Sequence, residues 1–120
     1  MDFDECPCTG KTLARLLQPA IMSVLAQEPL HGYLIAQRLR TLAIFEGTTP
    51  DYAGVYRTLN AMQEQGLVRA SWDTPESGPA KRCYQLTRAG KACMAKWLET
   101  LQRYERAIHE LTEVLGARLA

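Results

Sequence analysis

The sequence lacks the segments that direct a chain into a membrane or out of the cell. No apolar run approaches the roughly 18 residues that a membrane-spanning helix needs. The acidic first five residues, MDFDE, are the opposite of the basic start of a signal peptide. Four cysteines in 120 residues are also too sparse for a disulfide framework. We therefore expect a cytoplasmic protein that has free thiols and no association with membranes.

The chain also lacks a strong overall charge. Its formal net charge is +1, so no basic field over the whole protein attracts nucleic acid. The distribution is nevertheless uneven, because residues 31–91 hold eight Lys or Arg against five acids, whereas residues 1–30 hold two against four. Any basic surface must be local and must come from the middle of the chain.

Motifs for phosphate transfer and metal-dependent hydrolysis are missing as well. The chain has no Gly-rich phosphate loop, no HExxH pair, and no set of Cys, His and Asp that can be assigned to one cleft. We therefore predict that it is not an enzyme. Apolar residues make up 47% and charged residues 22%, which is typical of a folded chain, and the length fits one domain.

Apolar residues at helical spacing predict two helices in the first part of the chain. The first has Pro19 in its first turn and ends near residues 28–29. The second opens at His31 and Gly32, with His31 as a capping residue, and ends before Gly47. Its apolar stripe is expected to consist of Leu34, Ile35, Leu39 and Leu42.

The third helix has the clearest predicted start. Thr49 is the N-cap candidate, Pro50 suits the first helical position, and Asp51 in the first turn is favoured by the helix dipole. Gly66 suits the residue that ends the helix. Between them, the inward stripe is expected to consist of Val55, Leu59 and Met62.

A hairpin with a basic turn is predicted after the third helix. A strand over residues 67–72 leads through a turn at residues 73–79 into a second strand. Lys81 and Arg82 place two cations beside the turn, and Thr87 can cap the next helix. Such a hairpin between helices is typical of the wing of a winged helix-turn-helix, although the segment alone also fits an ordinary surface hairpin.

The last part of the chain predicts one long amphipathic helix with a heptad seam. The seam consists of Met94, Trp97, Leu101, Tyr104, Ile108, Leu111 and Leu115. A helix of about 28 residues is roughly 42 Å long, which is more than the small preceding body can cover. We expect the seam to pair with the same helix of a second copy. The alternative is that the helix folds back over its own domain.

Four short motifs occur in order along most of the chain. They are PLHGY at residues 29–33, GVYRTL at 54–59, EQGLV at 64–68 and the wing at 78–90. Together they resemble the PadR family of bacterial transcriptional regulators. The single helix after the wing is similar to the short form of the family, which implies homodimers held by that helix and the N-terminal region. The chain departs from the family at Arg57, where proline is often found.

The element order and this resemblance predict a mainly α (α+β) fold, a winged helix-turn-helix with a two-stranded wing and a long C-terminal dimerisation helix. We assign residues 1–18 to an N-terminal arm and short helix, 19–87 to the DNA-binding domain and 88–120 to the dimerisation helix. The implied function is that of a ligand-responsive repressor, which acts as a homodimer on a pseudo-palindromic operator in double-stranded DNA. The dimer interface is expected to contain Leu13, Leu17 and the seam residues.

The third helix of a helix-turn-helix enters the major groove with its N-terminal residues. The predicted contacts from this helix are Thr49, Tyr52, Tyr56 and Arg57. Arg57 can offer a bidentate fork to guanine or to a phosphate, and the tyrosines can donate hydroxyls to phosphates. Lys81 and Arg82 on the wing suit phosphate contacts better than base reading.

Trp97 is an unusual residue for a coiled-coil seam, because its ring leaves irregular space around it. The resemblance to the short form of the family implies such a pocket, because some short-form members bind planar aromatic compounds between tryptophans of this helix. We therefore name Met94, Trp97 and Leu101 as candidates for the pocket of a planar hydrophobic effector. The alternative is plain packing.

The Cys6-Pro7-Cys8 arm is not a general feature of the family. An exposed pair of thiols can bind a soft metal or be oxidised, and a Cys-Pro dipeptide can bind haem. Two sulfurs alone do not complete a tetrahedral zinc site, so no metal or other cofactor is assigned. The alternative function is a dimeric interaction protein that senses thiol state or metal through Cys6 and Cys8. Cys83 and Cys93 are expected to face the core, and His109 to be solvated.

Overall fold

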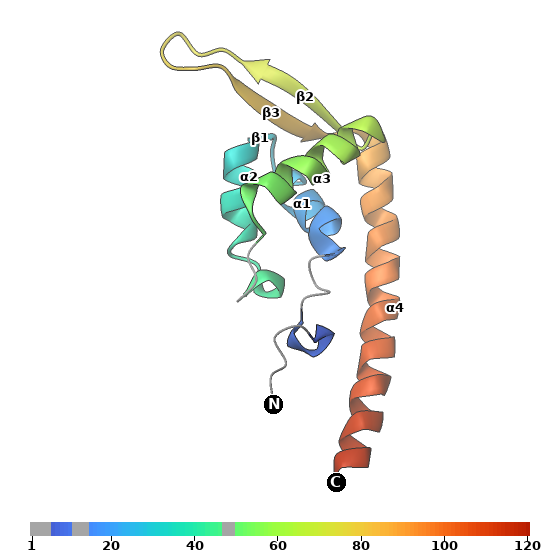
Figure 1. Ribbon diagram of the computed structural model, residues 1–120. Coiled ribbons are helices and arrows are strands. Elements are labelled where there is room, and N and C mark those ends of the chain that lie inside the picture. Colours follow the sequence, from blue (N-terminus) through green and yellow to red (C-terminus); the bar gives the residue numbers. More distant parts are fainter. Residues whose placement is uncertain (1–5, 11–14, 47–49) are drawn as a thin grey trace.

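The computed structural model describes residues 6–10, 15–46 and 50–120, which form a compact helical body with a projecting hairpin and one long helix (Figure 1). The elements are η1 (Pro7–Thr9), α1 (Leu17–Leu25), β1 (Leu30–His31), α2 (Gly32–Leu39), η3 (Ala43–Phe45), α3 (Tyr52–Glu64), β2 (Val68–Asp73), β3 (Lys81–Leu86) and α4 (Arg88–Leu119). This is the predicted winged helix-turn-helix. None of the helices described is long and apolar enough to cross a membrane.

The core lies where α1, α2 and α3 meet beneath the sheet. The predicted inward stripe of α3 is confirmed, because Val55, Leu59 and Met62 have no exposed surface. Tyr84 of β3 is buried against them with 1% of its surface exposed, which fixes the sheet on the helices. Removing such a side chain, as in Leu59→Ala, typically costs about 2–5 kcal/mol.

The predicted stripe of α2 was wrong at two positions, because Leu34 is 40% exposed and Leu42 lies beyond the end of the helix, although Leu42 still packs against the core. The helix is only eight residues long, and its buried residues are Gly32, Ile35, Ala36 and Leu39. These four recur at helical spacing, and Leu34 falls beside them. Adjacent residues of a helix point about 100° apart, so one of two neighbouring apolar residues faces outward.

His31 occupies the N-cap position of α2 but does not cap it with its side chain. Its Nε2 lies 3.1 Å from Oδ2 of Asp73 at the end of β2. The predicted place of His31 at the start of the helix is therefore confirmed, but its side chain bridges to the hairpin and makes no hydrogen bond to the first turn of α2.

The start of α3 lies later than predicted. The helix begins at Tyr52, and Asp51 is its N-cap, with Oδ1 accepting a 2.7 Å hydrogen bond from the backbone N–H of Gly54. Pro50 therefore precedes the helix, and Thr49, the predicted cap, lies outside the described residues. Thr and Asp both suit an N-cap, so the sequence allowed two registers. The predicted end is confirmed, because Gly66 adopts a positive φ of 77° directly after the C-cap.

The sheet has one more strand than the two predicted for the wing. Its order is β1-β3-β2, and both pairings are antiparallel. β1 contains only Leu30 and His31, which pair with Tyr84 and Cys83. Two residues are too few to show the alternation of a strand, so this strand could not be recognised from the sequence. Beyond β1 the β2-β3 hairpin continues alone and forms the projecting wing (Figure 1).

Thr87 caps α4 as predicted and also ties it to the end of α3. Its Oγ1 accepts a 3.0 Å hydrogen bond from the N–H of Gly90 and donates a 2.6 Å hydrogen bond to the carbonyl oxygen of Gly66. The N–H of Thr87 donates to the carbonyl oxygen of Leu67 at 3.1 Å. These bonds fix the direction in which α4 leaves the sheet.

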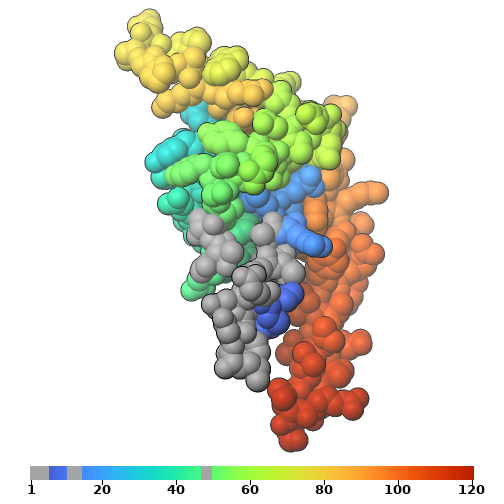
Figure 2. Space-filling view, in the orientation of Figure 1, coloured from blue at the N-terminus to red at the C-terminus, as the bar shows by residue number. Residues whose placement is uncertain are grey.

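The two halves of α4 have different surroundings. The helix has 32 residues, about 48 Å at 1.5 Å per residue. Its first half lies along α1, with Met94 and Trp97 packed against the core. Its second half extends past the helical body (Figures 1 and 2), and the seam residues there are exposed, with Ile108 at 62% and Leu111 at 60%. The first half therefore packs on its own domain, and the second half leaves its seam uncovered in a single chain.

Candidate nucleic-acid interface

The outer face of α3 is the first part of the candidate interface. At 3.6 residues per turn, Ala53, Arg57, Asn60 and Glu64 lie opposite the buried stripe of the same helix. All four are exposed. Arg57, a predicted DNA contact, therefore points away from the core. Asn60 was missed, although its place one turn after Arg57 could have been read from the helical period.

Arg57 and Asn60 carry the side-chain groups that suit base reading. A guanidinium can donate two parallel hydrogen bonds to guanine, and an amide can both donate to and accept from adenine. Their separation of three residues places both on one face, about 4.5 Å apart along the helix axis. This face can therefore present two neighbouring groups to the edges of adjacent bases.

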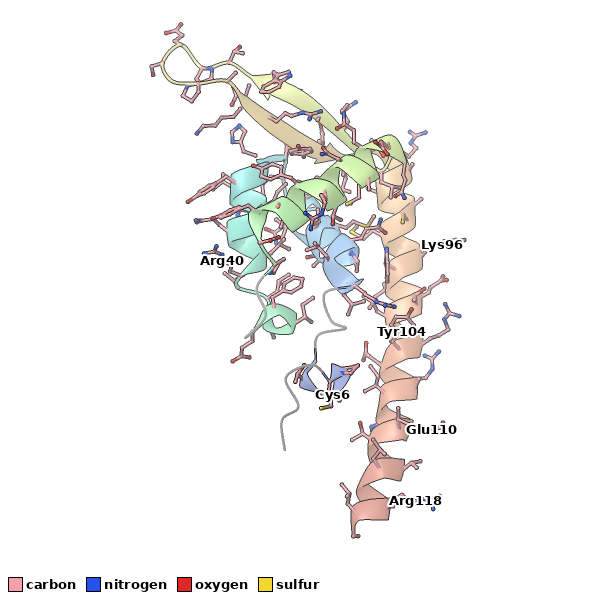
Figure 3. The ribbon with its side chains drawn as sticks, in the orientation of Figure 1. Cys6, Arg40, Lys96, Tyr104, Glu110 and Arg118 are labelled. Atoms are coloured by element: carbon pink, nitrogen blue, oxygen red, sulfur yellow. The ribbon has the colours of Figure 1, made fainter. Side chains whose placement is uncertain are left out.

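Two tyrosines connect α3 to α2. Tyr56 is 38% exposed and covers Gly32, where a Cβ atom would overlap its ring. Tyr52 stacks on Tyr33, with ring centroids 5.6 Å apart and planes within 6° of each other. The guanidinium of Arg40, the C-cap residue of α2, lies 5.5 Å from the Tyr52 ring (Figure 3). Tyr52 is half-buried by these contacts, whereas Tyr56 keeps more of its surface in solvent.

A groove of about 600 Å³ separates the wing from the starts of α2 and α3. Its lining residues are His31, Tyr33, Leu34, Tyr56, Trp72, Ala80, Lys81 and Arg82. It therefore brings predicted contacts from α3 and from the wing to one concave surface. Tyr33 and Trp72, which are 55% and 67% exposed, were not among the predicted contacts. Nothing in their sequence neighbourhoods indicated that they would line the same groove.

The two cations of the wing have different surroundings. Lys81 is exposed, whereas Arg82 is half-buried. Nη2 of Arg82 donates a 2.9 Å hydrogen bond to Oε1 of Gln63 on α3. The guanidinium carbon also lies 5.9 Å from the ring centroid of Trp72 and 5.8 Å from that of Tyr84. Burial raises the pKa of the Tyr84 hydroxyl, and the charge of Arg82 opposes that shift.

The predicted effector residues do not form one cavity within the described part of a single chain. Trp97 is half-buried, and its Nε1–H donates a 2.8 Å hydrogen bond to Oε1 of Gln18 on α1. Leu101 lines a different feature, an apolar groove of about 280 Å³. The other residues of that groove are Leu16, Pro19, Ala20, Ser23, Leu42, Ala43 and Ile44.

Of the predicted N-terminal dimer contacts, Leu17 packs against the core and Leu13 lies outside the described residues.

Cys6 is the N-cap of η1 and Cys8 lies within this single turn, on which Figure 3 labels Cys6. The backbone N–H of Cys8 lies 3.4 Å from Sγ of Cys6 and donates to it, which lowers the pKa of the Cys6 thiol. The thiol of Cys8 is hydrogen-bonded to Cys6, and its pKa is raised. Within the residues described, no group of three metal-ligating side chains is present. Cys93 packs against the core, and Cys83 is half-buried in β3.

Comparison with protein families and curated proteins finds two similarities. Residues 21–96 match the family described as the transcriptional regulator PadR-like family. A probable transcriptional regulator of Mycobacterium tuberculosis is 31% identical over 83 residues. The matched stretch is 68% of this chain and 43% of the relative, so the chain spans less than half the length of this curated relative.

Comparison with solved structures finds the same architecture. A putative transcriptional regulator from Thermoplasma acidophilum matches with a TM-score of 0.70 and 27% identity, over 86% of this chain and 96% of that one. A PadR family transcription regulator from Clostridium difficile matches with a TM-score of 0.71 and 20% identity, over 80% and 97%. PadR from Bacillus subtilis in complex with operator DNA matches with a TM-score of 0.62 and 24% identity, over 70% and 47%.

Proposed function

Because the chain belongs to the PadR-like family of transcriptional regulators, we propose that it regulates transcription by binding double-stranded DNA through α3 and the wing. The observation that carries the proposal is the outer face of α3. Arg57 and Asn60 project there from a helix whose opposite face is fully buried. The family is one of regulators, in agreement with the prediction that the chain is not an enzyme.

In the proposed complex α3 lies in the major groove, as the recognition helix of a helix-turn-helix does. Arg57 and Asn60 then contact base edges, and the hydroxyl of Tyr56 donates to a phosphate. Lys81, at the mouth of the groove between the wing and the helices, contacts the neighbouring backbone. The similarity to a PadR protein whose structure contains operator DNA supports this arrangement.

We propose further that the protein acts as a homodimer and as a repressor. The second half of α4 supports a dimer, because it exposes Tyr104, Ile108, Leu111 and Leu115 on one seam. A two-fold dimer presents two copies of α3, so its operator is a pseudo-palindrome with half-sites about 34 Å apart. Pairing of two seams would also bury apolar surface that one chain leaves in water.

The test is binding to the DNA upstream of the protein's own gene, measured by gel shift and by fluorescence anisotropy. If six to ten phosphates are neutralised per dimer, the affinity should fall about 10³ to 10⁵-fold between 50 and 200 mM salt. Arg57→Ala should weaken specific binding by about 1–3 kcal/mol if it reads a base. Lys96→Ala is the matched control, because it removes the same charge from a side chain that points away from the body on α4 (Figure 3). Absence of binding at low salt would refute the proposal.

A planar hydrophobic effector at Trp97, with Met94 and Leu101 beside it, is a finer proposal within this function. The hydrogen bond from Trp97 to Gln18 supports it, because a ligand near the ring would alter the contact between α4 and α1. Since α4 begins directly after its cap Thr87, which follows β3 of the wing, such a change would be transmitted toward the DNA-binding face. Saturable quenching of Trp97 fluorescence in a Trp72→Phe variant is the expected result. No saturable quenching by any of a panel of planar compounds would refute this pocket.

The alternative function, sensing of thiol state or of a soft metal or haem by Cys6 and Cys8, is favoured by one observation. The two thiols lie on one exposed turn, and the pKa of the Cys6 thiol is lowered by the N–H of Cys8. Titration with Cu(I) or haem, with Cys6→Ser as control, tests this proposal. Equal binding by the control variant would refute it.

A further inference from the structure

Arg82 is arranged differently from a residue that contacts DNA phosphates. A phosphate contact needs a cation that solvent can reach, and Lys81 meets that requirement. The guanidinium of Arg82 instead has a donor committed to Gln63 and lies close to two aromatic rings. Its position therefore suggests a role within the protein.

The contacts of Arg82 join three elements of the fold. Trp72 is its cross-strand partner on β2, Tyr84 is its neighbour on the same face of β3, and Gln63 belongs to α3. Tyr84 is 1% exposed and fixed in the core. Gln63 lies on the same flank of α3 as Tyr56, because seven residues complete almost two helical turns. Arg82 thus connects the wing to the flank of α3 that borders the groove.

We propose that Arg82 is a positioning residue that fixes the angle between the wing and α3. The proposal rests on the proposed function, because both elements must reach one DNA duplex at the same time. A planar guanidinium can stack on rings while it donates in its own plane, and the ammonium group of a lysine cannot. Without this connection the wing would sample other orientations. Affinity falls in proportion to the fraction of molecules that hold the competent orientation, so a fraction of about one tenth means a loss of about tenfold.

The first experiment follows the connection without DNA. The chain has two tryptophans, so a Trp97→Phe background leaves Trp72 as the only indole, and all variants are compared within that background. Gln63→Met removes the acceptor while keeping the length of the side chain, and Arg82→Lys keeps the charge. Both variants should increase the quenching of Trp72 fluorescence by acrylamide, whereas Lys81→Ala should not. Unchanged quenching in both variants would overturn the proposal.

The second experiment measures DNA binding at several salt concentrations. Gln63→Met and Arg82→Lys should each weaken binding about tenfold with an unchanged dependence of log affinity on log salt concentration. The double variant should bind no more weakly than Arg82→Lys alone, because both substitutions break one connection. Lys81→Ala should instead reduce the salt slope by about 1.8 per dimer, the value for two lost phosphate contacts.

The outcomes separate a positioning role from a phosphate contact. If Arg82→Lys binds like the wild type, and Arg82→Ala flattens the salt slope as Lys81→Ala does, Arg82 acts through its charge and the proposal is wrong. If the wild-type protein binds no DNA, the proposed function and this role within it both fail. The quenching of Trp72 would still report whether Gln63 holds Arg82, so the two failures are distinguishable.

Discussion

Gly90 and Gly116 of α4 should respond in opposite directions to the same substitution. Gly90 lies in the first turn, where a Cβ atom would overlap the carbonyl oxygen of Leu67 and lie 3.0 Å from the Leu86 side chain. Around Gly116 no described atom lies within 4 Å of such a Cβ. Gly90→Ala should therefore destabilise the protein, and Gly116→Ala should stabilise it.

The magnitudes follow from the competition between helix propensity and packing. Alanine in a helix interior is favoured over glycine by about 0.5–1 kcal/mol. At Gly90 the obstacle is backbone, which cannot rotate away, and overpacking of this kind costs about 1–3 kcal/mol. Moving α4 aside would also weaken the hydrogen bonds of Thr87 to Leu67 and Gly66, at about 1 kcal/mol each. We expect a net loss of about 2–4 kcal/mol for Gly90→Ala.

Urea unfolding followed by far-ultraviolet circular dichroism provides the measurement, with free energies extrapolated to zero denaturant. All variants must be compared at one chain concentration, because the proposed dimerisation would contribute to the apparent stability. A Gly90→Ala variant as stable as the wild type would refute the close approach of α4 to Leu67. Destabilisation of Gly116→Ala by as much as Gly90→Ala would show that both glycines respond to something other than this approach.

Three further predictions follow. Asp51→Ala should destabilise the protein by about 1 kcal/mol through loss of the α3 cap, whereas Asp51→Asn should be nearly neutral, both measured by urea unfolding. Ile108→Glu places a charge on the uncovered seam and should convert a dimer to monomers in sedimentation experiments; an unchanged mass would exclude this seam as the interface. Because its pKa is lowered, Cys6 holds more thiolate than Cys8 below the ordinary thiol pKa. Iodoacetamide should therefore modify Cys6 faster than Cys8 at neutral pH, as peptide mass spectrometry can show, and the reverse order would contradict the hydrogen bond between them.

The elements with strong local signals were predictable from the sequence. The buried stripe of α3 and its end at Gly66 were both predicted correctly. Helical spacing of apolar residues, and a glycine where the backbone needs a positive φ, can each be recognised within a short stretch of sequence. The cap at Thr87 was also predicted correctly, whereas α4 is longer than expected, with 32 residues. Of the candidate interface, the outward direction of Arg57 follows from the same helical period, and Asn60 could have been found by applying it one turn further.

The features that failed depend on contacts between distant residues. β1 is too short to show a pattern and exists because β3 pairs with it. The side chain of His31 extends to Asp73, 42 residues later, so no local rule for caps could place it. The different surroundings of Lys81 and Arg82 are another case, because they depend on the contact of Arg82 with Gln63, which lies 19 residues earlier on α3.

The sequence by itself determined the order of the main helices and of the two wing strands, the buried face of α3 and the heptad seam of α4, but not strand β1. Each of these is a repeat or a cap within about one or two turns of chain, and its physical cause is local. Only the tertiary structure decided the groove between the wing and the helices and the connection from Arg82 to Gln63. Those features arise where separate elements pack, and the packing is set by the shared burial of a core around residues such as Tyr84 and Leu59.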